Sequence, residues 1–508
     1  MTYSNNGLVA KLVPTSISDA IRMLLLALLL NRLYSWGCNI LFHKLSKFPG
    51  PWYAGMSRGP AIYHQLKGDY ATWVLDLHET YGECVRFSPN ELSFSGAEAH
   101  RDMYGHKACG PNGLVKHPKF YKPLRADSVA ILSADYDNHS RMRRIFSHAF
   151  SDRALKLQEP MFLMYVDKLI AKMRASTRAD PDRKHDYIKL LNCTTFDIMG
   201  DLTFGESLQM LDNDEYHPWV AMIFESIRIG AIMQVIRYFP FIEHIISNNM
   251  PKKAMEGMIE HQRFSRERVD RRLARKDARP DIWGLVLQKD GSGAGLTKKE
   301  MYSNAGVFMV AGTETTATLL SGLTYYMLKN PATMAKLVRE IRTTFATESD
   351  MTYERLQAMK YLHACLEEGL RMYPPVPVGL PRRTPEGPPT IIDGHEIPGG
   401  VCVAATHLAT NRNPNNFHDP YKFDPERWRR DSEYYANDKK QAFQPFSLGP
   451  RGCLGKNMAY HEMRLILVKV LYNFDLSLCE ESDDWANQKT FTLWDKPELM
   501  VRFTERKD

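Results

Sequence analysis

The sequence predicts a mainly α-helical protein with small β-sheets, joined to a single N-terminal membrane-anchor helix. Three observations support this prediction. An apolar run from Met23 to Phe42 has about the length of a bilayer core; most of the chain after residue 48 has a helical pattern; and short strand-like runs with glycine turns, such as residues 390–405, interrupt it. We expect residues 1–47 to form the anchor and its hinge, and residues 48–508 to form one domain.

The composition excludes several classes of protein. With 508 residues, 44% of them hydrophobic, the chain has ordinary globular usage. Its net charge of +7 suits an acidic protein partner or an anionic membrane surface, and is too small to indicate a nucleic-acid partner. Its eight cysteines are scattered without a C-x-x-C pair, so a disulfide framework or a zinc site is not expected. No nucleotide-binding fingerprint is present, so any electrons must come from another protein.

The anchor carries a charge that leaves two arrangements open. Arg32 costs about 2.5–3.5 kcal/mol at the centre of a spanning helix, which the neighbouring leucines roughly offset. The segment therefore either spans the membrane or lies in its interface, and a cleaved signal peptide is less favoured. Lys44 and Lys47 favour the cytosol for the following end, and Pro49 and Pro51 predict a non-helical hinge. Deleting residues 1–45 is expected to release the protein from membranes.

Two polar stretches of the domain are expected to be solvent-exposed. Residues 290–295 are expected to form a flexible loop. They are not expected to bind phosphate, because they lack the G-K-[ST] ending of a phosphate-binding loop. Residues 263–279 are basic at helical spacing, and no aromatic residues interleave as in a nucleic-acid site. We expect a solvated face that carries four arginines, Arg268, Arg271, Arg272 and Arg275.

A long central helix is predicted from residue 297 to about residue 328. Thr297 and Glu300 form a capping box at its start, and Asn330-Pro331 follows its end. About 30 residues at 1.5 Å each would cross the whole domain. Its middle reads "AGTETT", residues 311–316, where a glycine weakens the helix by about 1 kcal/mol.

Two interpretations of that polar patch are possible. In one, the helix kinks and the threonine hydroxyls bond back to backbone carbonyls. In the other, the patch is a groove in which Glu314 and Thr315 relay protons.

A glycine-rich loop near the C-terminus holds one cysteine, Cys453, in "FSLGPRGCLG". The glycines let backbone amides approach the sulfur, and a helix begins directly afterwards, so its dipole and amides stabilise a thiolate. Such a thiolate suits the proximal position of a haem iron, with Arg451 placed to pair with a haem propionate. The motif comprises five residues at fixed spacing, Phe446, Gly449, Arg451, Cys453 and Gly455.

With these motifs in this order, nearly the whole chain resembles the cytochrome P-450 family, the haem-thiolate monooxygenases. The "AGTET" stretch is similar to the family's central-helix motif. Glu368 and Arg371 match its E-x-x-R, and "FDPERW" at residues 423–428 resembles its meander motif. The resemblance implies a cytochrome P-450 fold with one catalytic domain at residues 48–508.

The resemblance also implies roles for further residues. Glu368, Arg371 and Arg427 would form a buried ion-pair network behind the haem. "HSRMRRIFSHAFS" at residues 139–151 resembles a haem-contacting helix in which Arg143 would meet a propionate, while His139 stands where the family has tryptophan. A second propionate would meet Arg382, with Arg383 as the alternative.

Cofactors and partners follow from the same resemblance. It implies haem b with Cys453 as axial thiolate ligand, O2 as co-substrate, and electrons from NADPH through a separate NADPH-cytochrome P-450 reductase. Basic side chains could dock that acidic partner or be merely solvated: Lys456, Arg464, Arg141 and Arg144. The expected location is the endoplasmic reticulum membrane, with the catalytic domain facing the cytosol. No nucleic acid is expected.

The substrate is expected to be a hydrophobic small molecule. By analogy it would lie among residues 105–127, 216–230, 375–381 and 490–492. The sequence is most similar to filamentous-fungal members that modify terpenoids and polyketides in secondary metabolite biosynthesis, such as trichothecene hydroxylases. Two alternatives remain: a haem-thiolate isomerase or dehydratase that needs no reductase, and a non-catalytic haem-binding protein.

Overall fold

The fold is mainly α-helical with small β-sheets, as predicted. The structure, a computed structural model, describes residues 16–110, 113–122, 129–249, 252–275, 277, 279–289 and 295–506. All but the last residue of the loop predicted at residues 290–295 lies outside this range.

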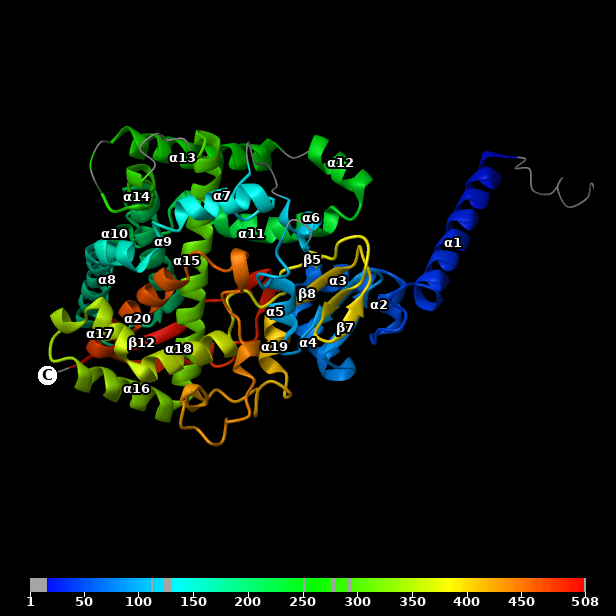
Figure 1. Ribbon diagram of the computed structural model, residues 1–508. Helices are drawn as coiled ribbons and strands as arrows, with labels where there is room; N and C mark the ends of the chain where they lie inside the picture. Colours follow the sequence, from blue (N-terminus) through cyan, green and yellow to red (C-terminus); the bar gives the residue numbers. More distant parts are fainter. Residues whose placement is uncertain are drawn as a thin grey trace, which may run out of the picture.

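The helices follow in chain order and make up most of the body (Figure 1). They are α1 (Ile17–Leu41), α2 (Trp52–Met56), α3 (Gly59–Lys67), α4 (Tyr70–Tyr81), α5 (Ala99–Tyr104), α6 (Pro118–Tyr121), α7 (Tyr136–Phe146), α8 (Asp152–Ala179), α9 (Tyr187–Phe204), α10 (Met210–Asn213), α11 (Pro218–Ile236), α12 (Pro240–Asn248), α13 (Lys252–Ala274), α14 (Ile282–Lys289), α15 (Lys298–Leu328), α16 (Pro331–Thr344), α17 (Tyr353–Ala358), α18 (Lys360–Met372), α19 (His407–Arg412) and α20 (Lys456–Asn473).

Four small sheets complete the described fold. The largest has the order β1-β2-β8-β5-β3, with β2 and β8 parallel and the other neighbours antiparallel. The others are β4-β12-β9, β6-β7 and β10-β11. The strands are β1 (Cys84–Ser88), β2 (Glu91–Phe94), β3 (Val115–Lys116), β4 (His185–Asp186), β5 (Arg382–Arg383), β6 (Thr390–Ile392), β7 (His395–Ile397), β8 (Cys402–Ala405), β9 (Phe474–Leu478), β10 (Lys489–Phe491), β11 (Leu493–Asp495) and β12 (Met500–Glu505). The strand-like run predicted at 390–405 is therefore confirmed as β6, β7 and β8.

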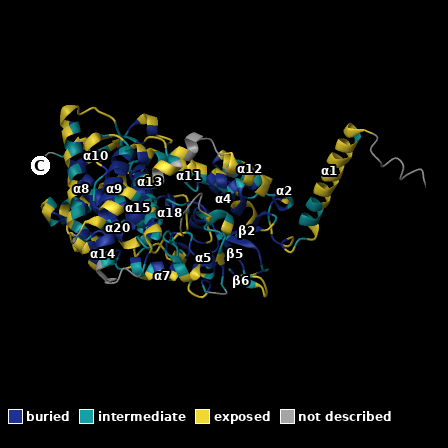
Figure 2. Cartoon of the chain, turned by 90° about the horizontal axis from the view of Figure 1, so that it is seen from above, coloured by how far each residue is buried: buried dark blue, intermediate teal, exposed yellow. Residues whose placement is uncertain are grey.

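The N-terminal helix α1 stands away from the body (Figures 1 and 2). None of its 25 residues is buried, and it is long and apolar enough to cross a membrane. Residues 42–51 contain no helix, as the two prolines predict. However, Leu45 and Phe48 are buried in the core of the large sheet, so the body packs from residue 45 onward.

Helix α15 passes through the middle of the body (Figure 1). The capping box of Thr297 and Glu300 is present at its start, as predicted. Gly312 has a packing reason that the sequence could not show: a Cβ there would lie 2.8 Å from the Met199 side chain of α9. A side chain at residue 312 would therefore require the Met199 side chain to move.

The expected solvated face on residues 263–279 holds for Arg271 and Arg275, which are 52% and 40% exposed, and is wrong for Arg268 and Arg272. Arg272 is only 2% exposed and pairs with Asp281 at 2.5 Å. The other three arginines share one acid partner, Glu206, at 2.6–3.6 Å: Arg268, Arg271 and Arg275. The arginines of this stretch pair with three acids that the fold brings to it, Glu206, Asp281 and, through Arg279, Asp201.

Candidate active site

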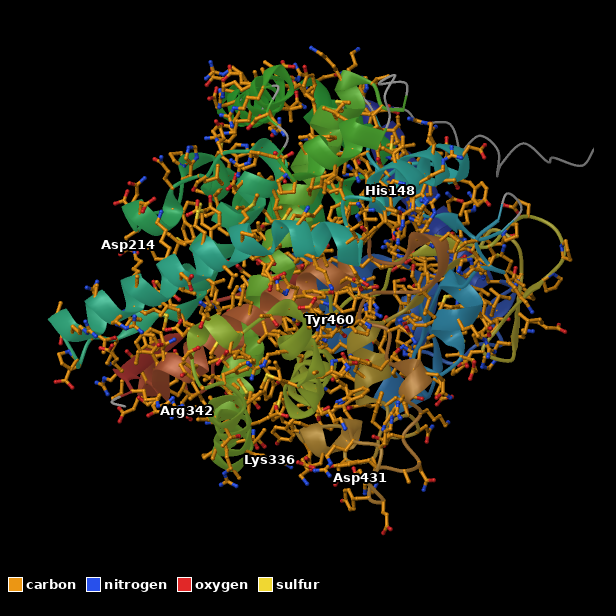
Figure 3. All side chains as sticks on the ribbon, turned by 60° about the vertical axis from the view of Figure 1, so that its left-hand side comes forward. His148, Asp214, Lys336, Arg342, Asp431 and Tyr460 are labelled. Carbon is orange, nitrogen blue, oxygen red and sulfur yellow. The ribbon has the colours of Figure 1, made fainter. Side chains whose placement is uncertain are left out.

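The cysteine loop is built so that its backbone can turn sharply. Gly449 has φ +65°, and a Cβ there would collide with the carbonyl oxygen of Tyr104, so the position requires glycine. The backbone N–H of Cys453 donates to the carbonyl of Phe446 at 2.8 Å. The Phe446 ring lies 5.1 Å from that of Tyr460, which Figure 3 labels. Gly455 then caps α20, whose N-terminus follows Cys453 by three residues.

Cys453 is unusual among the eight free cysteines because it is the exposed one. Even so, burial raises the pKa of its thiol, and the Gly455 amide and the charges of Arg143 and Lys456 lower it in part. A side chain that is both accessible and surrounded by protein faces an internal hollow. The thiol would ionise on binding a metal.

Helix α15 also has accessible residues in the middle of the body, and they lie on one face of the helix. In its buried middle, Ala311 is exposed and Thr315 is half-buried, while Thr313, Glu314 and Thr316 are buried. The Thr315 hydroxyl donates to the Ala311 carbonyl at 2.7 Å. Bonding back to carbonyls, one of the two interpretations of this patch, is therefore present, and it leaves the oxygen of Thr315 facing open space within the body.

A cluster of cations lies beside the cysteine loop. Its members surround His139: burial, followed by the charges of these cations, lowers the pKa of His139 to about 3. The cluster consists of Arg451, Lys116, Arg143 and Arg382. Within the described chain none of the four pairs with a carboxylate, and their partners are oxygens of Ala134, Leu132, Gly452 and Tyr121.

This cluster fits the two propionates of a haem. Arg382 is buried and the other three cations are half-buried, so an anion that joined them would offset their desolvation. Arg382 Nε is buried without a hydrogen-bond partner in the described chain. Burial and the charges of Arg451 and Arg382 lower the pKa of Lys116 to about 6. A bound anion would favour the charged form of this lysine. Sequence reasoning missed Lys116, because only the pairing of β3 with β5 brings it here.

Arg382 and Arg383, adjacent on β5, differ in surroundings. Arg382 is 2% exposed and faces the cation cluster. Arg383 is about half exposed and pairs with Glu386 at 2.7 Å. The burial of Arg382 favours it over Arg383 as the propionate partner.

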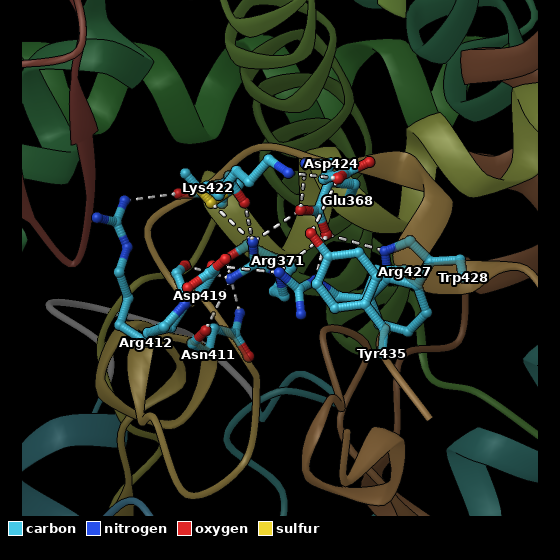
Figure 4. Close-up of polar contacts among 12 residues, drawn as sticks. Glu368, Arg371, Asn411, Arg412, Asp419, Lys422, Asp424, Arg427, Trp428 and Tyr435 are labelled. Carbon is cyan, nitrogen blue, oxygen red and sulfur yellow. Dashed lines mark hydrogen bonds and ion pairs between the residues drawn. The ribbon is translucent and has the colours of Figure 1, made fainter. Parts of the chain in front are cut away.

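The E-x-x-R residues form the network that the resemblance implied (Figure 4). Arg371 donates to both oxygens of Glu368, at 2.7 and 2.8 Å, and to three backbone carbonyls. Arg427 Nε lies 3.6 Å from Glu368 and its Nη1 donates to Asp438 at 2.6 Å. All four side chains are 0% exposed. Asp438 was not predicted, and it makes the network neutral: two acids with two arginines.

Glu314 does not share the surroundings of Thr315. Its carboxylate forms an ion pair with Lys496, and both side chains are 4% exposed. Lys496 also donates to the Thr318 hydroxyl at 2.7 Å. The sequence did not indicate this lysine.

A cavity of about 70 Å³ collects segments predicted to contact substrate. His117 and Phe120 come from residues 105–127, Val378 from 375–381, and Thr490 from 490–492. Helix α11 contributes Ala231 and residue 234, just beyond the predicted 216–230. The lining is more polar than predicted.

The added polarity comes from a charged group at the wall. Arg58 pairs with Glu91, and the Tyr238 hydroxyl donates to Glu91 at 3.2 Å. Lys119 lies 4.0 Å above the Tyr238 ring.

The basic residues suggested for partner docking divide into two pairs. Lys456 and Arg144 are exposed. Arg464 is buried against the Tyr460 ring, so its expected surface role is wrong. Arg141 is half-buried and pairs with Glu300.

A lone accessible cysteine at a helix start, beside four cations that have no acid partner among the described residues, is the arrangement that a haem-thiolate protein requires. The family model for cytochrome P-450 matches residues 54–503. The chain belongs to the cytochrome P-450 family, whose members hold haem through a cysteine thiolate.

Relatives cover the chain nearly end to end. It is 48% identical to cytochrome P-450 monooxygenase efuB of Hormonema carpetanum, over 91% of this chain and 92% of the relative. It is 43% identical to cytochrome P-450 monooxygenase FUM2 of Gibberella moniliformis, over 92% of this chain and 99% of the relative. It is 40% identical to cytochrome P-450 monooxygenase astA of Talaromyces wortmannii, over 93% of this chain and 94% of the relative. The protein is a haem-dependent monooxygenase.

Proposed function

We propose that Cys453 is the axial ligand of haem b and that the enzyme oxidises a hydrophobic small molecule in fungal secondary metabolism, as a terpenoid or polyketide hydroxylase. The accessible Cys453 beside the acid-free cation cluster is the observation that carries the proposal. Bound there, haem would supply activation of O2 and transfer of one oxygen atom to substrate.

The residues described above would hold a bound haem and shield it from solvent. Arg143, Arg382, Arg451 and Lys116 would pair with the propionates of a bound haem, and His139, neutral at physiological pH, would offer a hydrogen-bonding ring without adding charge. Phe446, Gly449 and Gly455 shape the loop around the sulfur.

The 70 Å³ cavity is proposed as the outer end of the substrate site, because its volume is below the roughly 300–1,000 Å³ of a ligand pocket and its lining does not include Thr315 or Cys453. Its apolar wall accepts a hydrophobic body, and the Arg58, Glu91 and Tyr238 group offers hydrogen bonds to oxygen functions on it.

Electrons come in this proposal from NADPH through a separate NADPH-cytochrome P-450 reductase. Lys456 and Arg144, exposed near the cysteine loop, are the cations available to an acidic docking face. The proposed location is the endoplasmic reticulum membrane, with residues 48–508 in the cytosol.

The test is a reconstitution with reductase, NADPH and O2. We expect a strongly red-shifted Soret band in the reduced, carbon-monoxide-bound protein, and oxidation of apolar test substrates that stops when reductase is left out. Turnover that continues without reductase would favour the isomerase or dehydratase alternative. A thiolate band without any turnover would favour the non-catalytic one.

Thr315→Ala is expected to separate electron use from product. Because the Thr315 hydroxyl faces the hollow, its loss removes a proton-relaying group, and product per NADPH should fall on the order of tenfold while hydrogen peroxide is released. Thr313→Ala is the matched control, since that hydroxyl is buried and bonded to the Met309 carbonyl at 2.5 Å. Equal coupling in both variants would remove Thr315 from the relay.

Membrane contact is proposed to involve the body as well as α1. Figures 1 and 2 place α2 and α12 on the side that carries α1. Trp52 on α2 is 67% exposed, and Phe241 on α12 is 76% exposed, with Ile242 and Ile245 beside it. Apolar surface of this kind is typical of an interfacial contact.

Deleting residues 1–43, which spares the buried Leu45, should therefore release the protein from vesicles only in part. Adding Phe241→Asp to this deletion should complete the release, as measured by vesicle flotation. The matched control is Tyr421→Asp, an exposed aromatic residue whose hydroxyl bonds to Glu79 on the α4 side of the body. Complete release by the deletion alone would confine membrane contact to α1.

A further inference from the structure

We propose that Lys119 and Arg58 hold a carboxylate of the substrate at the outer end of its site, so that the substrate is a hydrophobic molecule with one acidic group. The inference rests on the proposed function, since it takes the 70 Å³ cavity as that outer end. It adds the chemical class of the substrate and the residues that select it.

The first step is where the two cations meet. Arg58 directly precedes α3, Lys119 lies on α6, and both line the cavity. They lie over one ring, that of Tyr238 after α11, with Arg58 Cζ 3.6 Å and Lys119 Nζ 4.0 Å from its centroid. Three segments far apart in the chain therefore bring two like charges to one wall of the cavity.

The second step is the charge balance of this wall. Among the described residues that line the cavity, Glu91 is the only acid, and it pairs with Arg58. The side chains of Arg58 and Glu91 are 15% and 9% exposed, so the pair is withdrawn from water. His117 adds no charge at neutral pH, because burial and the Arg58 charge lower its pKa to about 4. Lys119 is left as one uncompensated positive charge, which matches a ligand with one negative charge.

The third step concerns the acids near Lys119 in the described chain. The acid that its ammonium senses is Glu243, which pairs instead with Lys122 at 2.6 Å. The Tyr238 ring attracts the ammonium through its π-electrons but carries no counter-charge. Burial, followed by repulsion from Arg58, lowers the pKa of Lys119. A carboxylate in the cavity would offset both effects.

The fourth step is hydrogen bonding. Arg58 Nε and the Thr490 hydroxyl are buried without a partner in the described chain, and both residues line the cavity. Both groups can donate, because a hydroxyl hydrogen rotates to suit its acceptor. With the Lys119 ammonium they offer donors of the kind that a carboxylate accepts on its two oxygens. Gln65 Oε1, likewise buried without a partner, can accept from a hydroxyl of the same ligand.

The remaining lining determines which part of the acid is oxidised. Phe87, Phe120 and Val378 give the cavity an apolar side for a hydrocarbon body. Because the lining does not include Thr315 or Cys453, an acid held here must extend beyond the cavity to be oxidised. Oxidation is therefore expected on a carbon remote from the carboxylate.

The experiment measures ligand binding to the full-length holoenzyme at neutral pH, by ligand-induced shifts of its Soret band. The probes are dodecanoic, hexadecanoic and abietic acids, each compared with its own methyl ester, which keeps the apolar body and loses the charge. We expect at least one acid to bind on the order of tenfold more tightly than its ester, because the acid alone forms charge-assisted hydrogen bonds.

Variants assign this preference to the wall. Lys119→Met should bring the affinities for acid and ester to within about twofold of each other, and Lys119→Arg should keep most of the preference. The matched control is Lys47→Met: Lys47 also lies over a ring, 5.4 Å from the centroid of Phe48, but is exposed and outside the cavity lining. It should leave the preference unchanged.

Two results would overturn the inference. One is a panel in which no acid is preferred over its ester, including a panel in which no acid binds. The other is a preference for the acid that survives Lys119→Met or is lost equally in Lys47→Met. The thiolate band of each variant reports whether it has folded. Failure of the proposed function would appear separately, as a missing thiolate band in the reduced, carbon-monoxide-bound unaltered protein.

Discussion

Cys453→Ala abolishes oxygenation and removes the red-shifted Soret band of the reduced, carbon-monoxide-bound protein. This is the expected result because the iron would lose the thiolate whose electron donation favours O–O cleavage. Nothing nearby replaces it: the other cysteines of the domain are buried, and His139 lies among four cations. We expect activity below detection rather than a partial loss.

Two further variants make this result interpretable. Cys453→His should still bind iron but give the shorter-wavelength band of a nitrogen ligand, which shows that the loop itself has folded. Cys38→Ser, on α1, is the control and should leave both the spectrum and the activity unchanged. A thiolate band that persists in Cys453→Ala would mean that another residue is the ligand.

Arg371→Ala is expected to prevent accumulation of folded protein. The substitution removes the arginine that donates to both oxygens of Glu368 and leaves Arg427, at 3.6 Å, as the remaining cation near that buried carboxylate; breaking a buried pair costs about 3–5 kcal/mol. Arg371 also satisfies three backbone carbonyls, which would lose their donor. Against a total stability of about 5–15 kcal/mol, little folded protein should remain.

The measurement is the urea midpoint, together with the yield of soluble holoprotein. The matched control is Arg429→Ala, whose partner Asp431 is 69% exposed and lies at the lower edge of the molecule in Figure 3. That exposed pair should be worth at most about 1 kcal/mol. The double variant Glu368→Met with Arg371→Met removes both charges and should recover part of the loss, which keeps the prediction testable if the single variant does not fold. Equal midpoints for Arg371→Ala and Arg429→Ala would contradict it.

Features that depend only on residues adjacent in the chain were predictable from the sequence. The capping box at Thr297 needs only four residues, and the strand-like run at 390–405 needs only its turns. The cysteine loop likewise carries its own glycines. In each case the local chemistry does not depend on what packs against it.

Features that depend on distant partners were missed. Asp438 neutralises Arg427, and Lys116 joins the cation cluster, only because the fold brings them there. Arg268 and Arg272 of α13 were misjudged for the same reason, since their partners Glu206 and Asp281 lie outside that helix. Acid and base partners far apart in the chain leave no periodic signal.

The position of the cavity has a consequence for how substrate concentration should be defined. The cavity is lined by residues of α3 and α11, which pack on each other, and α2 joins α3 to the anchor helix α1. Given the proposed substrate site and membrane contact, we expect an apolar substrate dissolved in the lipid to reach the cavity without first entering water. The quantity that fills the site is then the mole fraction of substrate in the bilayer, which depends on its partition coefficient and on the amount of membrane present, so a poorly water-soluble compound can saturate the enzyme.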